Sequence, residues 1–458
     1  MTREQIQQHQ ADRLRSLLQR LIPANHFWTS KWQAAGVDLS QAAIDSLRAP
    51  EDLSRFPLTT KAELVEDYKG HPPYGSNLTF EVGTYSRFCQ TSGTTGQPLR
   101  WLDTPESWQW MLGCWEQIFE MSGLRADDRL AFPFSFGPFL GFWAAFEGAA
   151  RLGRLCLPGG GMSSEARLKF IEENQATVVC CTPTYALRLA EVAADLAKQP
   201  GNSTASEMLK SVRLLIVAGE PGGSVPSIRN KIEAAWGARV IDHWGMTEVG
   251  PLAAECVENP GGLHILETEC IAEIIDPETG YVLLADGCWP MADGRQSQPS
   301  SPPIRGELVI TNLGRIGSPM IRYRTGDIVE LDSLPCPCGR NLLRLKGGIL
   351  GRIDDMLTIR GNNVFPTAIE AILREFPEVI EFQFRTVTRD SMPQLQIEIE
   401  TTMGIPDADE LDEFHAMIDR IESAIHDRLH FCPEVIPVDT HSLPRSEMKS
   451  RRMNRKQK

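Results

Sequence analysis

Short apolar runs alternate with longer amphipathic stretches through the middle of the chain. The runs have the length of buried strands and are predicted as strands at residues 129–134, 154–157, 177–182, 212–218 and 238–242. The stretches between them are predicted as helices at residues 139–151, 164–174, 183–197 and 228–236. This alternation predicts a parallel sheet covered on both faces. Such sheets bind ligands beyond the carboxyl ends of their strands, so chemistry is expected in the loops after residues 218 and 242.

The two flanks of this region have different patterns. Residues 1–85 read as helices joined by short loops, and Thr60 and Glu63 have the spacing of a capping box at a helix start. Past residue 251, short β-like segments are expected near 270–275 and 307–311, with a mobile surface loop at 293–303 between them. In the last block we expect strands near 379–387 and 394–400 and a helix near 409–429. 

The fold class predicted from these patterns is α/β. The 458 residues exceed the usual limit of about 250–300 for a single core, so at least two domains are expected. Residues 1–350 would form a large domain with parallel sheet layers and a β-rich subdomain. Residues 351–458 would form a small, mobile α+β domain.

Composition narrows the class of partner and the location. The formal net charge of -14 argues against sequence-independent binding of nucleic acid, which needs clustered cations. No run of about 20 apolar residues exists, so no membrane span is expected. Residues 1–20 lack the apolar core of a signal peptide, and the expected location is the cytoplasm. The 11 cysteines are then expected to be reduced thiols or metal ligands.

A loop rich in Gly and hydroxyl side chains is the strongest local feature. It consists of Thr91, Ser92, Gly93, Thr94, Thr95 and Gly96, followed by Gln97 and Pro98. The glycines let backbone N–H groups converge on an anion, and the hydroxyls add donors without bulk. The loop is not a Walker loop, which ends in Gly-Lys-Ser or Gly-Lys-Thr. Taken alone, it fits a triphosphate and a polar turn equally well.

Four further segments follow in a fixed order. They are Asp-His-Trp-Gly-Met-Thr-Glu at 242–248, Tyr-Arg-Thr-Gly-Asp at 323–327, Gly-Arg-Ile-Asp-Asp at 351–355 with Arg360 and Gly361 beyond, and Leu-Pro-Arg-Ser-Glu-Met-Lys at 443–449. From about residue 85 to 452, this series resembles the adenylate-forming superfamily of acyl-CoA synthetases and adenylation domains. In motif detail it is most similar to phenylacetate–coenzyme A ligases.

The resemblance implies an AMP-forming acid–thiol ligase. Such an enzyme activates a carboxylic acid with ATP to an acyl-adenylate. It then transfers the acyl group to coenzyme A, giving a thioester, AMP and pyrophosphate. The resemblance also implies a homodimer through the large domain. There are two alternatives: an adenylation enzyme that loads a carrier protein, and an inactive nucleotide-binding homologue. The inactive homologue is favoured by the uncharged Gln97, at a position where the family commonly has Lys.

The resemblance implies a role for each motif in binding ATP. The loop from Thr91 to Gly96 would wrap the β- and γ-phosphates, and Gly219, Glu220 and Pro221 would lie along the adenine. Trp244 and Gly245 would line the purine and the acyl group. Asp327 would accept hydrogen bonds from the ribose hydroxyls, and Arg352 would add a donor there.

Catalytic roles are implied in the same way. Thr247 would reach the α-phosphate, and Glu248 would bind Mg²⁺, a cation that prefers oxygen ligands. Lys449 would offset the charge that develops at the α-phosphate, although a solvated lysine in a basic tail is the alternative. Asp354 would be the hinge about which the small domain rotates, with Arg360 and Gly361 then lining the thiol tunnel; a simple linker is the alternative.

Two cysteines one residue apart, Cys336 and Cys338, have the spacing of a zinc knuckle. Cys256 and His264 lie just after the Thr247–Glu248 motif and would supply the remaining ligands. We therefore predict a structural Zn²⁺ site, with separate buried thiols as the alternative.

An aromatic segment, residues 132–139, follows the first predicted strand of the sheet. Phe134 and Phe136, together with Trp244, would wall an acyl pocket for a flat, apolar acid such as an aryl acid. Ordinary core packing explains the same pattern.

Overall fold

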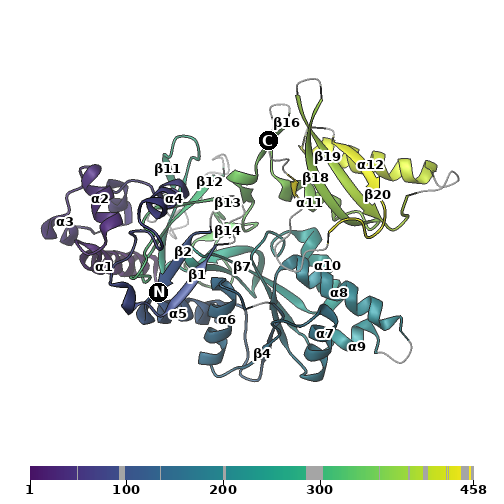
Figure 1. Ribbon diagram of the computed structural model, residues 1–458, viewed down its shortest axis with the longest axis horizontal. Helices are drawn as coiled ribbons and strands as arrows, with labels where there is room; N and C mark the ends of the chain where they lie inside the picture. The colour runs from purple at the N-terminus through teal and green to yellow at the C-terminus, as the bar shows by residue number, and fades with distance from the viewer. Residues whose placement is uncertain are drawn as a thin grey trace.

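The computed structural model describes residues 1–48, 50–91, 98–134, 136–199, 203–284, 303–359, 362–389, 392–405, 411–429, 431, 433–444 and 453–454 (Figure 1). None of the helices in these ranges is both long enough and apolar enough to cross a membrane.

An eight-stranded sheet lies at the centre, in the order β14-β9-β8-β7-β6-β5-β3-β4. Five neighbouring strands are parallel: β3 (Arg129–Phe132), β4 (Leu155–Pro158), β5 (Val178–Cys181), β6 (Leu214–Val217) and β7 (Arg239–Met246). The connecting helices are α6 (Leu140–Arg151), α7 (Ser164–Glu173), α8 (Pro183–Ala197), α9 (Ala205–Leu209) and α10 (Pro226–Trp236). The predicted strands and helices are thus confirmed, with ends that shift by a few residues because the apolar runs extend beyond the hydrogen-bonded ladders.

Strand β7 differs from the prediction in one respect that affects the site. Its first half pairs in parallel with β6, and its second half pairs antiparallel with β8 (Gly250–Cys256). Changing partner keeps the backbone groups of β7 hydrogen-bonded past the end of β6. The prediction of a loop directly after residue 242 is therefore wrong: residues 242–246 lie within the strand. Strands β9 (Asn259–Ile265) and β14 (Arg344–Lys346) continue the antiparallel part.

The N-terminal region is helical, as predicted, and is followed by a hairpin. Its helices are α1 (Arg3–Leu21), α2 (His26–Ala34), α3 (Gln41–Asp45) and α4 (Lys61–Gly70), with 3-10 turns η1 (Pro50–Arg55) and η2 (Val82–Thr84). The capping box of Thr60 and Glu63 starts α4, as predicted. Strands β1 (Arg87–Gln90) and β2 (Arg100–Asp103) form the hairpin on either side of the predicted phosphate loop, and α5 (Pro105–Met121) follows.

A five-stranded antiparallel sheet, in the order β11-β10-β12-β13-β15, accounts for the predicted β-rich part. Its strands are β10 (Cys270–Ile275), β11 (Val282–Leu284), β12 (Arg305–Asn312), β13 (Tyr323–Glu330) and β15 (Gly351–Arg352). The predicted surface loop at 293–303 lies outside the described residues except for Pro303.

The C-terminal part has its own hydrophobic core, separate from the two cores of the rest of the chain. It contains η3 (Ile353–Asp355), β16 (Leu357–Ile359), β17 (Asn362–Val364), α11 (Pro366–Leu373), β18 (Val379–Arg389), β19 (Met392–Thr401), α12 (Leu411–Leu429), β20 (Glu434–Val438) and β21 (Met453–Asn454). Figure 1 shows β18, β19, β20 and α12 at the opposite end of the molecule from α1–α3. The α/β fold class is thus confirmed.

Candidate active site and metal cluster

Three residues predicted to bind the nucleotide meet where β7, β13 and β15 come together. The indole Nε1 of Trp244 donates to Oδ2 of Asp327 at 2.9 Å, and Arg352 donates to Oδ1 of the same carboxylate at 2.8 Å. Register supports this contact, because Asp327 and Arg352 are cross-strand partners. Arg352 also lies 3.6 Å from the carboxylate of Asp354, the predicted hinge residue. The sheet thus brings together side chains that are up to 110 positions apart in the sequence.

Gly245, the next residue along β7, is required by close backbone packing. A Cβ atom at this position would lie 2.8 Å from the Cα of Pro251 and 2.9 Å from the carbonyl oxygen of Gly250. The strand change from β6 to β8 therefore explains this glycine without a ligand.

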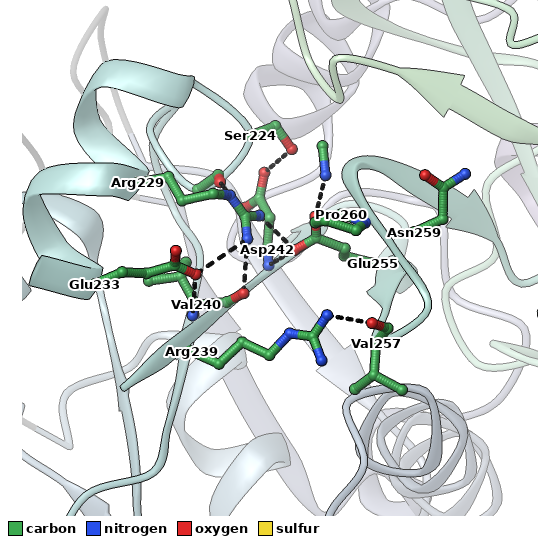
Figure 2. A network of polar contacts seen from close by, with 12 residues as sticks. Ser224, Arg229, Glu233, Arg239, Val240, Asp242, Glu255, Val257, Asn259 and Pro260 are labelled. Carbon is green, nitrogen blue, oxygen red and sulfur yellow. Dashed lines mark hydrogen bonds and ion pairs between the residues drawn. The ribbon is translucent and has the colours of Figure 1, made fainter. Parts of the chain in front are cut away.

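Asp242 is a buried carboxyl at the carboxyl end of the parallel strands (Figure 2). The hydroxyl of Ser224 donates to its Oδ2 at 2.6 Å. Gly223 lies so close that a Cβ there would be 2.5 Å from Cγ of Asp242. Burial raises the pKa of Asp242 to about 7, with Ser224 opposing and Glu255 reinforcing the shift. This carboxyl can therefore change charge near neutral pH.

The loop after β6 begins at the predicted adenine segment. Gly219 has φ of +93°, a conformation that favours glycine. Glu220 accepts a hydrogen bond from the backbone N–H of Thr184 at 2.8 Å, in the first turn of α8. Its carboxylate is thus anchored to the helix start, and the adenine contact of Gly219, Glu220 and Pro221 stays a prediction.

Glu248, the predicted Mg²⁺ ligand, lies in the turn between β7 and β8. Its side chain is 4% exposed, and within the described part of the chain its carboxylate makes no hydrogen bond or ion pair. A carboxylate on a largely buried side chain that makes no direct contact with the described part of the protein is free to bind a cation, and hard cations prefer such oxygen ligands.

Arg315 holds the backbone of the Thr247–Glu248 turn by hydrogen bonds. It donates to the carbonyl oxygens of Thr247 at 2.5 Å and Glu248 at 3.0 Å. The same guanidinium forms a bidentate pair with Asp103 at 2.8 and 2.7 Å, and both side chains are fully buried. Sequence reasoning missed Arg315 and Asp103, because the two lie 212 positions apart and neither belongs to a motif.

The predicted phosphate loop is described only at its ends. The backbone N–H of Thr91 donates to the carbonyl of Leu99 at 2.9 Å, and the N–H of Leu99 donates to the Thr91 hydroxyl at 3.0 Å. Six residues of this segment lie outside the described residues: Ser92, Gly93, Thr94, Thr95, Gly96 and Gln97. The same holds for Lys449 and for the predicted tunnel residues Arg360 and Gly361.

Phe134 and Phe136 belong to an aromatic cluster after β3. Their rings lie 5.5 Å apart, and Phe136 also contacts Trp143 at 5.1 Å and Phe146 at 5.3 Å. Phe134 is 5% exposed and packs in the core. For Phe134 this agrees with the core-packing alternative; the acyl-pocket role of both residues stays a prediction.

The four predicted zinc ligands come together. The ligand atoms of Cys256, His264, Cys336 and Cys338 all lie within 4.8 Å of one another. Sγ of Cys256 is 3.6 Å from Sγ of Cys336, and Sγ of Cys338 is 3.5 Å from Nε2 of His264. A tetrahedral ion with Zn–S bonds of about 2.3 Å would hold two sulfurs about 3.8 Å apart. The Cys256–Cys336 and Cys338–His264 separations are close to the spacing that a bound zinc ion needs.

Protonation in this cluster follows from burial and hydrogen bonding. Burial raises the pKa of Cys256 to about 12 and lowers that of His264 to about 4. Burial also works against ionisation of Cys338, but hydrogen bonds, first from the Arg340 backbone, lower the pKa of Cys338 overall. His264 is thus neutral, which is the form that binds a metal. Cys338 ionises more readily than Cys256.

Two family patterns match the chain. The family described as AMP-binding enzyme matches residues 86–287, and the AMP-binding enzyme C-terminal domain matches residues 361–456. The phenylacetate–coenzyme A ligase of Thermus thermophilus is 30% identical over 98% of this chain and 95% of its own length. That of Escherichia coli is 30% identical over 98% of this chain and 94% of its own length.

Solved structures of a 2-hydroxyisobutyryl-CoA ligase match in two states. In its postadenylation state, with an acyl-AMP bound, the TM-score is 0.82 at 27% identity, covering 97% of this chain and 88% of that one. In its thioesterification state, with acyl-AMP and coenzyme A bound, the TM-score is 0.66 at 28% identity and the same coverage.

Proposed function

The chain belongs to the phenylacetate–coenzyme A ligase family of AMP-binding enzymes, and from that premise we propose that its substrate is an aryl or arylacetic acid. As a member of this family, it is an AMP-forming acid–thiol ligase. ATP activates the carboxylate as an acyl-adenylate with release of pyrophosphate. The thiol of coenzyme A then attacks the acyl carbon and AMP leaves.

The observation that carries the ATP step is Glu248, a largely buried side chain near Arg352 whose carboxylate has no direct partner among the described residues, together with the Trp244–Asp327–Arg352 contacts. Mg²⁺ at Glu248 would balance that charge and draw the triphosphate towards Thr247. Asp327, held from two sides, would accept from the ribose. Thr91 and Leu99 are joined by hydrogen bonds at the base of the segment that would receive the β- and γ-phosphates.

The acid class is supported by the aromatic cluster and by the relatives. Phe136 is only partly buried and lies after β3, at the same sheet edge as Asp242. A flat ring packed against Phe136 would bury apolar area, and it would lose less conformational entropy on binding than a flexible acyl chain. The phenylacetate ligases named above act on such an acid.

We also propose that residues 1–350 and 351–458 are separate domains that move about Asp354. The better match to a postadenylation state supports an arrangement that precedes thioester formation. A hinge at Asp354 would lie close to Asp327, because Arg352 contacts both carboxylates. In one state Lys449 would reach the α-phosphate; in the other, Arg360 and Gly361 would line the path of the thiol.

Carboxylate-dependent ATP–pyrophosphate exchange tests the first half-reaction. Labelled pyrophosphate and a panel of aryl, arylacetic, fatty and amino acids are used without coenzyme A. We expect exchange with aryl or arylacetic acids, and the thioester on adding coenzyme A but not on adding a carrier protein. Exchange with none of these acids, despite ATP binding, would contradict the proposal.

Lys449→Ala provides the matched test of catalysis. Adenylate formation should fall by about 100-fold or more while ATP binding is retained, because the lysine acts on the charge of the transition state. Replacement of a neighbouring basic residue, Arg455→Ala, is the control and should leave exchange unchanged. Equal effects of the two changes would support a solvated basic tail instead.

Zn²⁺ in the Cys256–His264–Cys336–Cys338 cluster is a further proposal, supported by the tetrahedral spacing. Elemental analysis of protein purified without chelator should find stoichiometric zinc. Cys336→Ser should remove it, whereas Cys156→Ser, which changes a thiol away from the cluster, should not. Protein that contains no zinc and binds none on addition would overturn the proposal.

The homodimer and the cytoplasmic location remain predictions. Sedimentation of the purified chain and fractionation of cells that express it would test them.

A further inference from the structure

Arg229 on α10 joins three segments beneath the edge of the sheet that carries Asp242 (Figure 2). Its guanidinium donates to the carbonyl of Gly223 at 2.8 Å, to the carbonyl of Val240 at 2.8 Å and to Oε2 of Glu255 at 2.5 Å. The side chain is 8% exposed. One cation therefore fixes the loop after β6, strand β7 and strand β8 relative to one another.

Glu255 extends this connection to the β8–β9 hairpin. Its side chain is fully buried, and Oε2 also accepts from the backbone N–H of Asp242 at 3.0 Å. Its other oxygen, Oε1, accepts from the backbone N–H of Gly261. Glu255 precedes Cys256 in the chain, and Gly261 lies three residues before His264. The carboxylate thus lies between the nucleotide edge and two members of the metal cluster.

We propose that Arg229 and Glu255 are positioning residues that couple metal occupancy of the cluster to nucleotide affinity. The inference rests on the proposed nucleotide and zinc sites. A metal ion held by Cys256 and His264 would fix both ends of the hairpin around Glu255. Glu255 then holds Arg229 and the backbone of Asp242 in place. Arg229 in turn holds the loop after β6 at Gly223. The nucleotide meets a preformed edge and loses less free energy in ordering it.

Coupling of this kind is reciprocal. If zinc tightens AMP binding by a given factor, AMP must tighten zinc binding by the same factor. Both affinities can be measured without turnover, so the coupling is separable from catalysis.

Arg239 supplies the matched control. It lies on β7, the strand that carries Asp242, and its guanidinium donates to the carbonyl of Val257 in the β8–β9 hairpin. Its contact is exposed, and Figure 2 shows its guanidinium joined to Val257 and not to Glu255. Arg239→Ala removes a cation and a hydrogen bond to the hairpin while leaving the Arg229–Glu255 connection intact.

The experiment measures the dissociation constant of AMP by titration calorimetry, with zinc-loaded and zinc-depleted protein. In the wild type and in Arg239→Ala, zinc depletion should weaken AMP binding by about tenfold, within the usual range of coupling between sites. In Glu255→Gln and Arg229→Lys, depletion should change it by less than about twofold. In the wild type, AMP should raise the affinity for zinc, measured by competition with a chelator, by the same factor of about ten.

Three results would overturn the inference: no effect of zinc on AMP binding in the wild type, an equal effect in Glu255→Gln, or loss of the effect in Arg239→Ala. A merely structural role of the pair would lower the unfolding temperature and kcat but leave the zinc effect unchanged. If Glu255→Gln does not fold, Arg229→Lys tests the same connection, and an equal zinc effect there would overturn the inference. Normal AMP binding and pyrophosphate exchange without coupling would refute this inference and leave the proposed function standing; absence of both would refute the proposed function itself.

Discussion

Glu248 and Glu255 lie seven residues apart on the antiparallel extension of the same sheet, both buried, yet their surroundings are opposite. Glu255 is paired with Arg229 and accepts from two backbone N–H groups. Glu248 has no hydrogen bond or ion pair within the described residues. A buried charge is tolerated where it is compensated, and the fold compensates Glu255 through Arg229 and two backbone donors. Glu248 has no such direct contact among the described residues, which leaves its carboxylate available to a ligand.

The largest expected effect on stability comes from removing a charge of the scaffold. Arg315→Met would leave the fully buried carboxylate of Asp103 without its partner and the carbonyls of Thr247 and Glu248 without a donor. Loss of one member of such a pair costs about 3–5 kcal/mol of unfolding free energy. Urea unfolding followed by tryptophan fluorescence measures this loss.

The double variant Asp103→Leu with Arg315→Met is the control, because it removes the stranded charge. It should recover most of the lost stability but not the pyrophosphate exchange, since the Thr247–Glu248 turn stays unsupported. A double variant as unstable as the single one would show that packing, and not the buried charge, accounts for the loss.

The opposite change, at the unpaired carboxylate, should spare stability. Glu248→Gln removes a carboxylate that makes no direct hydrogen bond or ion pair among the described residues, so the unfolding free energy of the ligand-free protein should decrease little. Exchange should fall by about 100-fold, because the metal loses its anionic ligand. Titration with Mg²⁺ is the measurement, and Glu248→Asp should shift the Mg²⁺ requirement less than Glu248→Gln. A large loss of stability in Glu248→Gln would place this residue with the scaffold.

Asp242 stands between the two cases, because it is buried and accepts from Ser224, and Arg229 acts on it without a direct ion pair among the described residues. Its folded pKa of about 7 lies above the value of about 3.9 expected when unfolded, so the folded state holds the proton more tightly. Its contribution to stability is therefore full below about pH 4 and is lost as the pH rises towards 7.

Asp242→Asn removes this dependence. The unfolding free energy of the variant relative to wild type should rise by about 2 kcal/mol between pH 5 and pH 8. Urea unfolding at the two pH values measures this difference in the ligand-free protein. The exposed Asp276, whose pKa is lowered by hydrogen bonds from Thr279, offers the control: Asp276→Asn should show no such rise. A flat difference for Asp242→Asn would mean that Asp242 is ionised throughout.

The sequence was sufficient for those parts of the molecule that depend on local pattern. Apolar runs predicted all five parallel strands, because a strand buried on both faces has no polar positions. The Cys336 and Cys338 spacing, with His264 and Cys256 after a motif, predicted a cluster that the structure brings together. The continuation of β7 to Met246 was missed, because Asp242, His243 and Gly245 are unusual in a strand and only the partner change to β8 explains them.

Long-range pairs were beyond prediction for a different reason. The pairs Arg315–Asp103 and Arg229–Glu255 form only because the fold brings distant segments together. The sequence around each of these four residues looks like that around a solvated charge. The contact of Trp244 with Asp327 was expected only as two residues near one nucleotide, and the structure adds a direct hydrogen bond.

That hydrogen bond gives the smallest and most discriminating prediction. Trp244→Phe keeps a ring at the site but removes one donor to Asp327, which keeps Arg352. The loss is about 1 kcal/mol, or about fivefold in KM for ATP, with kcat nearly unchanged. Trp236→Phe is the matched control, because its indole also donates inside the protein, to the carbonyl of Ala186 on α8, away from Asp327. KM for ATP that rises equally in both variants would show that general loosening is responsible. A rise confined to Trp244→Phe would show that the position of the Asp327 carboxylate, set from two sides, contributes directly to holding the nucleotide.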